Sequence, residues 1–354
     1  MQDNLNLEKL PNFPISGPSA WYSNQMEDNK NWIYYLSKSE IQEIKQAILD
    51  TKDLQIIKLN ASNFILPRLK IKLKKILNDL ISGRGFVLLR GLPIKDLSME
   101  DVARAYWGIG QYIGSARSQN ANGDLLGHVI DLSKSVDDPN VRIYQTSARQ
   151  NFHCDSTDIV GLLCLQKAMS GGASSILSSV TLFNEILKNK PEYLEELSSP
   201  FYIDRRGETP KGKKPWYKLP VFCWYDNQLT THFTRPYIES AQRFNDVPKL
   251  TNKQICALNF FQELCERKDI QLNMDFEPGD IQLLNNYQIL HDRKEFKDWP
   301  SGKDKRHLLR LWLCTEESRK LHPIYLNRQD SIKIGNRGGI LVAGTKMNVN
   351  FEIT

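Results

Sequence analysis

The spacing of apolar residues changes along the chain, from a helical period in the first third to alternation further on. Apolar positions three and four residues apart predict amphipathic helices over residues 38–50, 69–81 and 98–114. Ser39, with Gln42 completing a capping box, is placed to cap the first of these, and Ser98 the third. Between the second and third, an apolar run bounded by glycine and proline (residues 83–93) predicts a buried strand.

From about Arg142 the pattern is one of strands separated by turn residues. Strands are expected within residues 143–165, 171–180, 278–291 and 307–314, and a hairpin should turn at Asp226-Asn227. One helix, over 251–267 and capped at Thr251, interrupts them. Helices first and strands later predict an α+β protein whose second half builds a sheet-rich, jelly-roll core.

Composition and charge indicate the class of protein, its partners and its compartment. The 354 residues are 40% hydrophobic and 25% charged, as in globular proteins, and we expect one domain. The formal charge of +6 is spread along the chain, which predicts no nucleic-acid partner. With no secretory signal or membrane-length apolar run, a cytoplasmic protein without a membrane partner is expected, and a homo-oligomer is compatible with the sequence. The six cysteines form no CxxC pair and are expected to be reduced and mostly buried.

The stretch NFHCDSTDIV contains two candidate metal ligands. On a strand, His153 and Asp155 would share one face while Cys154 points the other way. A third ligand is offered by His291, which the pattern places at the end of a strand where a turn begins. Two histidines and one carboxylate are the set that binds non-heme Fe(II) and leaves positions open for substrates. The alternative is that each histidine is an ordinary core or surface residue.

Two further features of the sequence favour a functional metal site over ordinary histidines. Arg306 and Arg310 lie before and within the last long strand, where residues four apart share a face, and buried arginines are costly unless they meet anions. The segment Gly171–Ser175, GGASS, is a tight turn that delivers small hydroxyl groups.

With these motifs in this order, the chain resembles the taurine dioxygenase (TauD/TfdA) family of Fe(II)- and 2-oxoglutarate-dependent oxygenases. The resemblance rests on FHCDSTD, SGGASSI, NNYQILHDR and KRHLLRLWL, and runs from about Gly85 to Cys314. It implies a double-stranded β-helix (clavaminate synthase-like jelly roll) with flanking helices. We therefore expect a catalytic core over 85–315, an N-terminal helical and extended wrap over 1–84, and a C-terminal extension over 316–354.

The resemblance also implies roles for single residues. His153, Asp155 and His291 would ligate iron, and Arg306, with Ser174 beside it, would hold the distal carboxylate of 2-oxoglutarate. Arg310 is a rival for that task, and would otherwise contact the substrate or the near carboxylate of 2-oxoglutarate. The cofactors would be Fe(II), 2-oxoglutarate and O2, with ascorbate as a supporting reductant.

The implied reaction is hydroxylation or desaturation of a small, anionic or amino-acid-like molecule, with release of succinate and CO2. Asp155 stands where related halogenases have a small residue, which disfavours chlorination. Two alternatives stay open at this point. A cupin-like metal hydrolase or isomerase could use the same three ligands, but would not need the GGASS turn and paired arginines. A non-catalytic ligand-binding descendant of the fold would often have lost a ligand.

Overall fold

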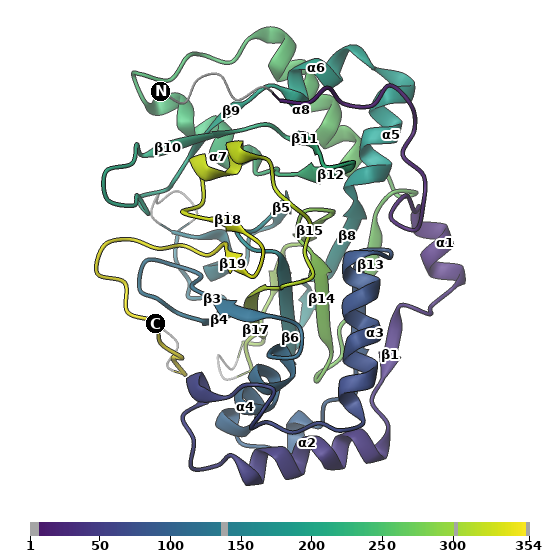
Figure 1. Ribbon diagram of the computed structural model, residues 1–354, viewed down its shortest axis with the longest axis vertical. Helices are drawn as coiled ribbons and strands as arrows, with labels where there is room; N and C mark the ends of the chain where they lie inside the picture. The colour runs from purple at the N-terminus through teal and green to yellow at the C-terminus, as the bar shows by residue number, and fades with distance from the viewer. Residues whose placement is uncertain (1–6, 136–140, 301–303, 352–354) are drawn as a thin grey trace.

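The computed structural model describes residues 7–135, 141–300 and 304–351, and its centre is a pair of β-sheets (Figure 1). The larger sheet runs in the order β1-β2-β14-β6-β17-β3, with β4 also paired to β17. The smaller sheet runs β13-β8-β15-β5. The strands of the larger sheet are β1 (Ile33–Tyr35), β2 (Phe86–Arg90), β14 (Ile281–Asn285), β6 (Ile159–Gln166), β17 (His307–Cys314), β3 (Ser115–Arg117) and β4 (Leu126–Ile130). Those of the smaller sheet are β13 (Leu272–Met274), β8 (Ser174–Ser178), β15 (Ile289–Arg293) and β5 (Gln150–His153).

Alternation along the strands divides the apolar side chains between two layers. On β2, Phe86 and Leu88 join a buried cluster with Ile176 and Ile289 of the smaller sheet, so this cluster fills the space between the sheets. Val87 and Leu89 point the other way, into a cluster formed with the helices. The first four residues of this strand, FVLL, are all apolar and are buried on both faces, as such a run predicts.

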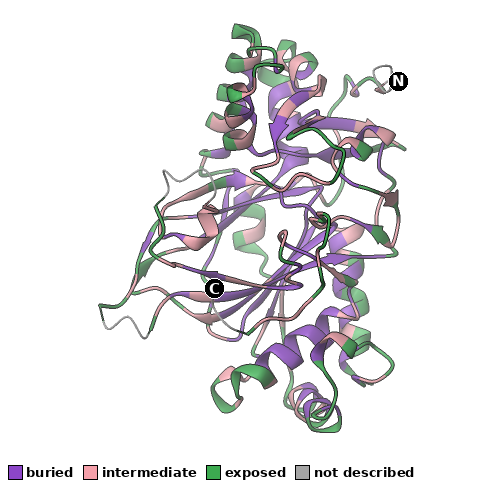
Figure 2. Cartoon of the chain, turned by 90° about the vertical axis from the view of Figure 1, so that its left-hand side faces the viewer, coloured by how far each residue is buried: buried purple, intermediate pink, exposed green. Residues whose placement is uncertain are grey.

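The outer face of the larger sheet is covered by α2 (Lys38–Asp50), α3 (Leu69–Ile81) and α4 (Met99–Gly110), whose buried sides face the strands (Figure 2). Ser98 caps α4 as predicted. The cap of α2 differs from the prediction. Ser37 is the N-cap, and Glu40 rather than Gln42 completes the capping box, because the chain enters the helix two residues before Ser39.

A layer of helices and short strands lies against the smaller sheet, between β8 and β13 in the chain. The predicted helix is α8 (Asn252–Cys265), capped by Thr251, and the predicted hairpin turns at Asp226-Asn227, where both residues have positive φ. The layer contains α5 (Ser179–Asn189), α6 (Glu192–Ser198), β9 (Phe201–Asp204), β10 (Trp216–Leu219), β11 (Phe222–Tyr225), β12 (Gln228–Thr231), α7 (Arg235–Ser240) and η4 (Ala241–Arg243). The expectation of a single helical interruption was therefore wrong, because α5 follows β8 at once without a glycine or proline break, and α6 begins just after Pro191.

Another correction concerns residues 278–291, which were expected to form one strand; their strand residues begin at Ile281. They form β14 and most of β15, which belong to different sheets and are separated by a turn at 286–288. The remaining elements are α1 (Ser23–Asp28), η1 (Ile56–Lys58), η2 (Ile94–Asp96), η3 (Ile143–Gln145), β7 (Ser170–Gly171), β16 (Phe296–Lys297), η5 (Pro323–Asn327), β18 (Ile332–Lys333) and β19 (Asn336–Arg337).

None of the helices in the described ranges is long and apolar enough to cross a membrane. All six cysteines are free thiols, and five of them are buried; Cys256 is exposed.

Candidate active site

Two of the three candidate ligands face each other across neighbouring strands. His291 lies in the middle of β15, and its partner in the antiparallel register of β5 is His153, the last residue of that strand. Their imidazole rings are 4.2 Å apart between centroids. The expectation that His291 ends a strand was wrong, because the turn that was expected there lies earlier, at 286–288. Cross-strand pairing, rather than a strand end, brings the two histidines together.

Asp155 is held in place through its backbone by a side chain that the sequence motifs did not single out. Asn286, in the turn between β14 and β15, accepts a hydrogen bond from the Asp155 amide at 2.7 Å. Its amide group also donates to the carbonyl oxygens of Asp155 and Thr157, each at 2.9 Å. The turn that precedes His291 thus fixes the carboxylate-bearing segment as well.

The three side chains present donor atoms that all lie within 4.8 Å of one another. Nε2 of His153 is 3.7 Å from Oδ1 of Asp155, and Nε2 of His291 is 3.9 Å from Oδ2. Burial lowers the pKa of His153, and lowers that of His291 to about 3, so both imidazoles are neutral at pH 7. Burial alone would raise the pKa of Asp155, but Arg310 and the two histidines hold it at about 2. Neutral imidazoles and an ionised carboxylate suit a divalent metal.

The hydrogen bonds around His153 set its tautomer. Its Nδ1 is 2.9 Å from the Asn151 carbonyl oxygen, to which it donates, and this leaves the Nε2 lone pair directed to the Asp155 side. The Gln150 amide also donates to Nε2, at 2.9 Å, so it has to turn away when a metal binds there. Nδ1 of His291 is buried and has no hydrogen-bond partner among the described residues.

Polar groups from β17 support the carboxylate of Asp155. The indole of Trp312 donates to Oδ2 at 2.8 Å, and Nη1 of Arg310 lies 3.4 Å from the same oxygen. Arg310 is fixed in turn by Gln119, which accepts from its Nε at 2.7 Å, and it lies over the rings of Tyr144 and Trp312. Such second contacts orient a ligand before the metal arrives.

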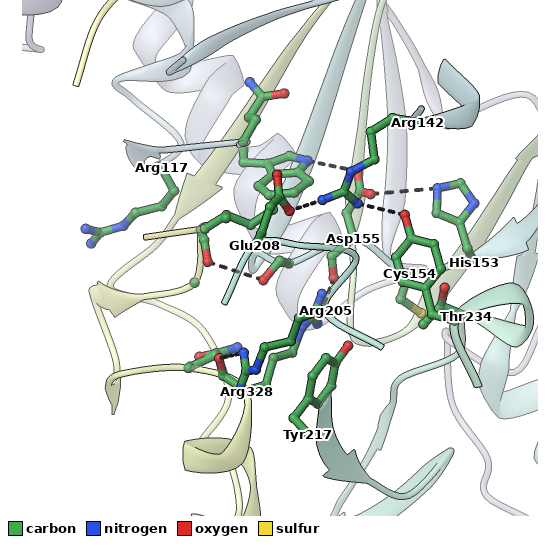
Figure 3. A pocket seen from close by; sticks show the side chains of 18 of the residues that line it. Arg117, Arg142, His153, Cys154, Asp155, Arg205, Glu208, Tyr217, Thr234 and Arg328 are labelled. Atoms are coloured by element: carbon green, nitrogen blue, oxygen red, sulfur yellow. Dashed lines mark hydrogen bonds and ion pairs between the residues drawn. The ribbon is translucent and has the colours of Figure 1, made fainter. Parts of the chain in front are cut away.

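These groups open into a cavity of about 480 Å3 that is rich in arginine (Figure 3). This volume suits a small molecule. His153 and Asp155 lie on its wall, whereas His291 does not. The arginines that line it are Arg117, Arg142, Arg149, Arg205, Arg310, Arg328 and Arg337, and the carboxylates are Asp155, Asp204, Glu208 and Asp330. The cavity therefore has more cations than anions along its walls and favours a negatively charged ligand.

One wall of this cavity comes from the C-terminal part of the chain, residues 328–331 and 336–341. Its backbone is bonded to the core: the Gly339 amide donates to the Ser156 carbonyl at 2.6 Å, and the Ile340 amide to that of Ser118 at 2.9 Å. Gly338 has a φ of +79°, and a Cβ there would lie 2.9 Å from the Ser156 carbonyl oxygen. Only glycine allows so close an approach.

A second group of buried cations lies away from this cavity. Arg306 is 5% exposed and lines a separate space of about 50 Å3 with Gly172. Its Nη2 donates to the Gly172 carbonyl at 3.2 Å, while Nη1 is buried without a partner among the described residues. Arg293, two residues after His291, also has a buried Nε and Nη1 without partners. Both guanidinium groups lie near the ring of Phe296, at 5.0 Å for Arg293 and 5.3 Å for Arg306.

The structure thus brings His153, Asp155, His291 and Arg310 together. It places Arg306 and Ser174, the other two predicted residues, elsewhere. Arg306 and Arg310 are both buried, but they do not line the same cavity. The Ser174 hydroxyl donates to the Asp292 carbonyl at 3.4 Å, and Ser174 lies opposite Arg293 in the register of β8 and β15.

Sequence reasoning missed Asn286, Arg293 and Trp312. The sequence held a signal for Arg293 and Trp312. Arg293 lies two residues after His291, and Trp312 two residues after Arg310, so each shares a strand face with a residue that the motifs had identified.

Comparison with known proteins decides the family. The profile described as "Taurine catabolism dioxygenase TauD, TfdA family" matches residues 50–312. The chain belongs to this family. FR-33289 synthase of Streptomyces rubellomurinus is 30% identical over 315 residues, which are 87% of this chain and 92% of that protein. The taurine hydroxylase-like protein SAT17 of Stachybotrys chartarum is 31% identical over 316 residues, 86% of this chain and 80% of that one.

Solved structures show the same fold. Asparagine oxygenase in complex with Fe(II), 2S,3S-3-hydroxyasparagine and succinate superposes with a TM-score of 0.62 at 16% identity, over 80% of this chain and 94% of that one. The non-heme iron oxygenase OrfP in complex with Fe and alpha-ketoglutaric acid gives 0.58 at 12% identity, over 79% and 93%. These likenesses confirm the expected α+β jelly roll with flanking helices.

Family membership confirms the class of enzyme that the motifs implied. The TauD/TfdA chain is a non-heme iron dioxygenase that uses Fe(II), 2-oxoglutarate and O2 and acts on a small molecule. The alternatives of a cupin-like hydrolase or a non-catalytic descendant are not supported. The match begins at residue 50, earlier than the Gly85 at which the motif resemblance began. It ends at 312, before the C-terminal wall of the cavity.

Proposed function

We propose that this TauD/TfdA enzyme hydroxylates or desaturates a small anionic substrate in the arginine-rich cavity, with release of succinate and CO2. The observation that carries the proposal is the meeting of two neutral imidazoles and one carboxylate, of which His153 and Asp155 lie on the wall of that cavity. His153, Asp155 and His291 are the proposed iron ligands. When bound there, Fe(II) with 2-oxoglutarate and O2 supplies the oxidant for the substrate.

The residues also fit 2-oxoglutarate. Buried guanidinium groups with unused N–H donors are costly, and a carboxylate is the group that satisfies them in pairs. Arg306 and Arg293 together offer three buried nitrogens without partners, so we assign both to the distal carboxylate. Ser174, opposite Arg293 in register, is the proposed hydroxyl donor, and this requires its hydroxyl to turn from the Asp292 carbonyl.

The protein's own contribution is positioning and charge. Trp312 and Arg310 hold the Asp155 carboxylate in one orientation and keep it ionised. Asn286 prevents its backbone from shifting. Arg310, next to that carboxylate, is assigned to the substrate or to the near carboxylate of 2-oxoglutarate.

Relatives support an anionic substrate. One curated relative, at 27% identity over 175 residues, is named uridine-5'-phosphate dioxygenase, and others, at 23%, are gamma-butyrobetaine dioxygenases. A cytoplasmic location belongs to the same proposal, and it is supported by six free thiols, because such thiols persist in reducing compartments.

The experiment is anaerobic reconstitution with Fe(II), followed by titration with 2-oxoglutarate. The wild-type protein should bind one Fe(II) and develop a weak visible charge-transfer band. Replacing any one of His153, Asp155 or His291 with alanine should abolish the band while the circular dichroism spectrum stays that of a folded protein. Unchanged bands in all three variants would refute the assignment of the ligands.

A further inference from the structure

Two arginines in the large cavity converge at a place that no iron or 2-oxoglutarate role accounts for. Arg205 follows β9 and Arg328 follows η5, and both guanidinium groups lie over the ring of Tyr217 (Figure 3). Their central carbons are 5.0 Å and 5.7 Å from its centroid. Segments more than a hundred residues apart in the chain therefore bring two positive charges to one aromatic surface.

Neither of the two has a carboxylate partner among the described residues. Arg205 donates to the carbonyl oxygens of Lys214, Asn327 and Arg328. Arg328 uses Nη1 alone, on the Asp155 carbonyl and on Nδ1 of His232, each at 3.1 Å.

The neighbouring arginines are different, since most of them are neutralised. Arg142 pairs with Glu208, Arg149 with Glu266 and Asp292, Arg310 with Asp155, and Arg337 with Asp158. Arg117, which also lacks such a partner, points away from the pair in Figure 3.

The groups around the pair do not supply the missing negative charge. Burial lowers the pKa of His232 well below its usual value, so this histidine is neutral. Asp204 is engaged by Ser240 and Arg243, and Asp330 is exposed and forms no ion pair with Arg205 within 4.0 Å. Burial, and then the charge of Arg328, lower the pKa of Arg205. Two like charges are thus held side by side with no carboxylate in an ion pair with either among the described residues, although the exposed Asp330 acts on Arg205 from further away and by itself raises its pKa.

From this arrangement we propose that Arg205 and Arg328 bind a doubly charged oxyanion of the substrate, a phosphoryl or phosphonyl group. A guanidinium has five N–H groups. In the hydrogen bonds above, Arg205 uses three of its five and Arg328 two of its five, which leaves two and three for a ligand. A phosphoryl group offers three acceptor oxygens and close to two negative charges, which matches the pair in number and in charge.

The site deepens the proposed function and rests on it. Because Arg328 bonds the carbonyl of the same Asp155 whose carboxylate is a proposed iron ligand, the anion would lie close to the metal. The carbon that is oxidised would then be only a few bonds from the phosphorus. Arg310, already paired with Asp155, is left to the near carboxylate of 2-oxoglutarate or to another part of the substrate.

The test is calorimetric titration of the iron-free protein with methylphosphonate, methyl phosphate and methanesulfonate at a pH where the first two are dianions. Methylphosphonate or methyl phosphate should bind more tightly than methanesulfonate, and the tighter of the two tells which group the substrate carries. Arg205→Gln and Arg328→Gln should each weaken the dianion about tenfold or more. Arg68→Gln, which removes an exposed charge outside the cavity, is the matched control and should change nothing.

Three results would overturn the proposal: equal binding of methanesulfonate, unchanged binding in Arg205→Gln, or displacement of methylphosphonate by 2-oxoglutarate. Failure of the proposed function can be recognised separately, because these titrations need no iron. In that case the wild-type charge-transfer band would be missing while the dianion still binds. If both proposals hold, adding methylphosphonate should shift the band of the wild type, and Arg205→Gln should keep the band but require correspondingly more ligand for the shift.

Discussion

Replacing Arg306 with methionine should weaken 2-oxoglutarate binding and, at the same time, stabilise the ligand-free protein. The side chain is 5% exposed, one of its nitrogens is buried without a partner, and its guanidinium, which donates to the Gly172 carbonyl, forms no ion pair among the described residues. Burial, and then the charge of Arg293, lower its pKa to about 9, which leaves it charged at neutral pH. In the ligand-free protein this buried charge therefore lowers the stability of the fold. In the complex it would instead bind the distal carboxylate of 2-oxoglutarate.

The magnitudes follow from the loss of a buried, charge-assisted pair. Removing one partner of such a pair costs roughly 2–5 kcal/mol, so the dissociation constant of 2-oxoglutarate should rise about 30-fold at the lower end. Replacing an unpaired buried charge with an apolar side chain of similar length should raise the free energy of unfolding of the ligand-free protein by about 1 kcal/mol or more. The methionine side chain can keep the packing against Phe296.

Two measurements check this prediction. The charge-transfer band of the Fe(II) protein gives the affinity for 2-oxoglutarate, and urea unfolding without iron gives the stability. Arg104→Met is the control, because Arg104 is equally buried but bonds the Thr51 and Leu54 carbonyl oxygens and Glu100, far from the site. It should lower stability and leave the affinity unchanged. An unchanged affinity in Arg306→Met would refute the assignment of Arg306 to the distal carboxylate.

Three further predictions follow from the same geometry. In chloride buffer, mass spectrometry should find only hydroxylated or desaturated product, since the Asp155 carboxylate fills the position that a halide would need; a chlorinated product would mean that it is not a ligand. Gly172→Ala should weaken 2-oxoglutarate by displacing Arg306, because a Cβ there would lie 2.9 Å from Nε of Arg306 and the residue has a φ of +71°; equal affinity in the same titration would contradict this. Arg310→Ala should weaken the binding of 2-oxoglutarate less than Arg306→Met does. The reverse order would mean that Arg310, and not Arg306, holds the distal carboxylate.

The sequence alone predicted the elements whose signals are local. The 69–81 helix, the Thr251 cap and the Asp226-Asn227 turn were confirmed because periodicity, a capping side chain and a turn dipeptide act over a few residues. The iron motif was recognisable for a related reason, since two of its ligands lie within three residues. Whether the chain divides at residues 84 and 315, as expected, stays a prediction.

The α2 cap and the helices α5 and α6 were missed locally, but the remaining failures depended on contacts between distant parts of the chain. Residues 278–291 were expected to form one strand, and the pairing of the two halves with different sheets shows that a turn divides them. Asn286 sits in that turn, and its task depends on Asp155, which lies far from it in sequence. Arg205 and Arg328 were unremarkable in the sequence for the same reason, because neither lies in a motif and only folding brings them over Tyr217.

The C-terminal wall of the cavity comes from a different part of the chain than the strands that carry the two proposed histidine ligands. The proposed iron ligands lie inside residues 50–312, the region that matches the family, whereas residues 336–341, and Arg328 with them, come after that match ends. Changes in this last segment can alter the shape and charge of the cavity without disturbing the metal or the strands that hold it. Part of the substrate's surroundings can therefore change through this last segment alone, although Arg205, the other half of the proposed anion site, lies inside the matched region.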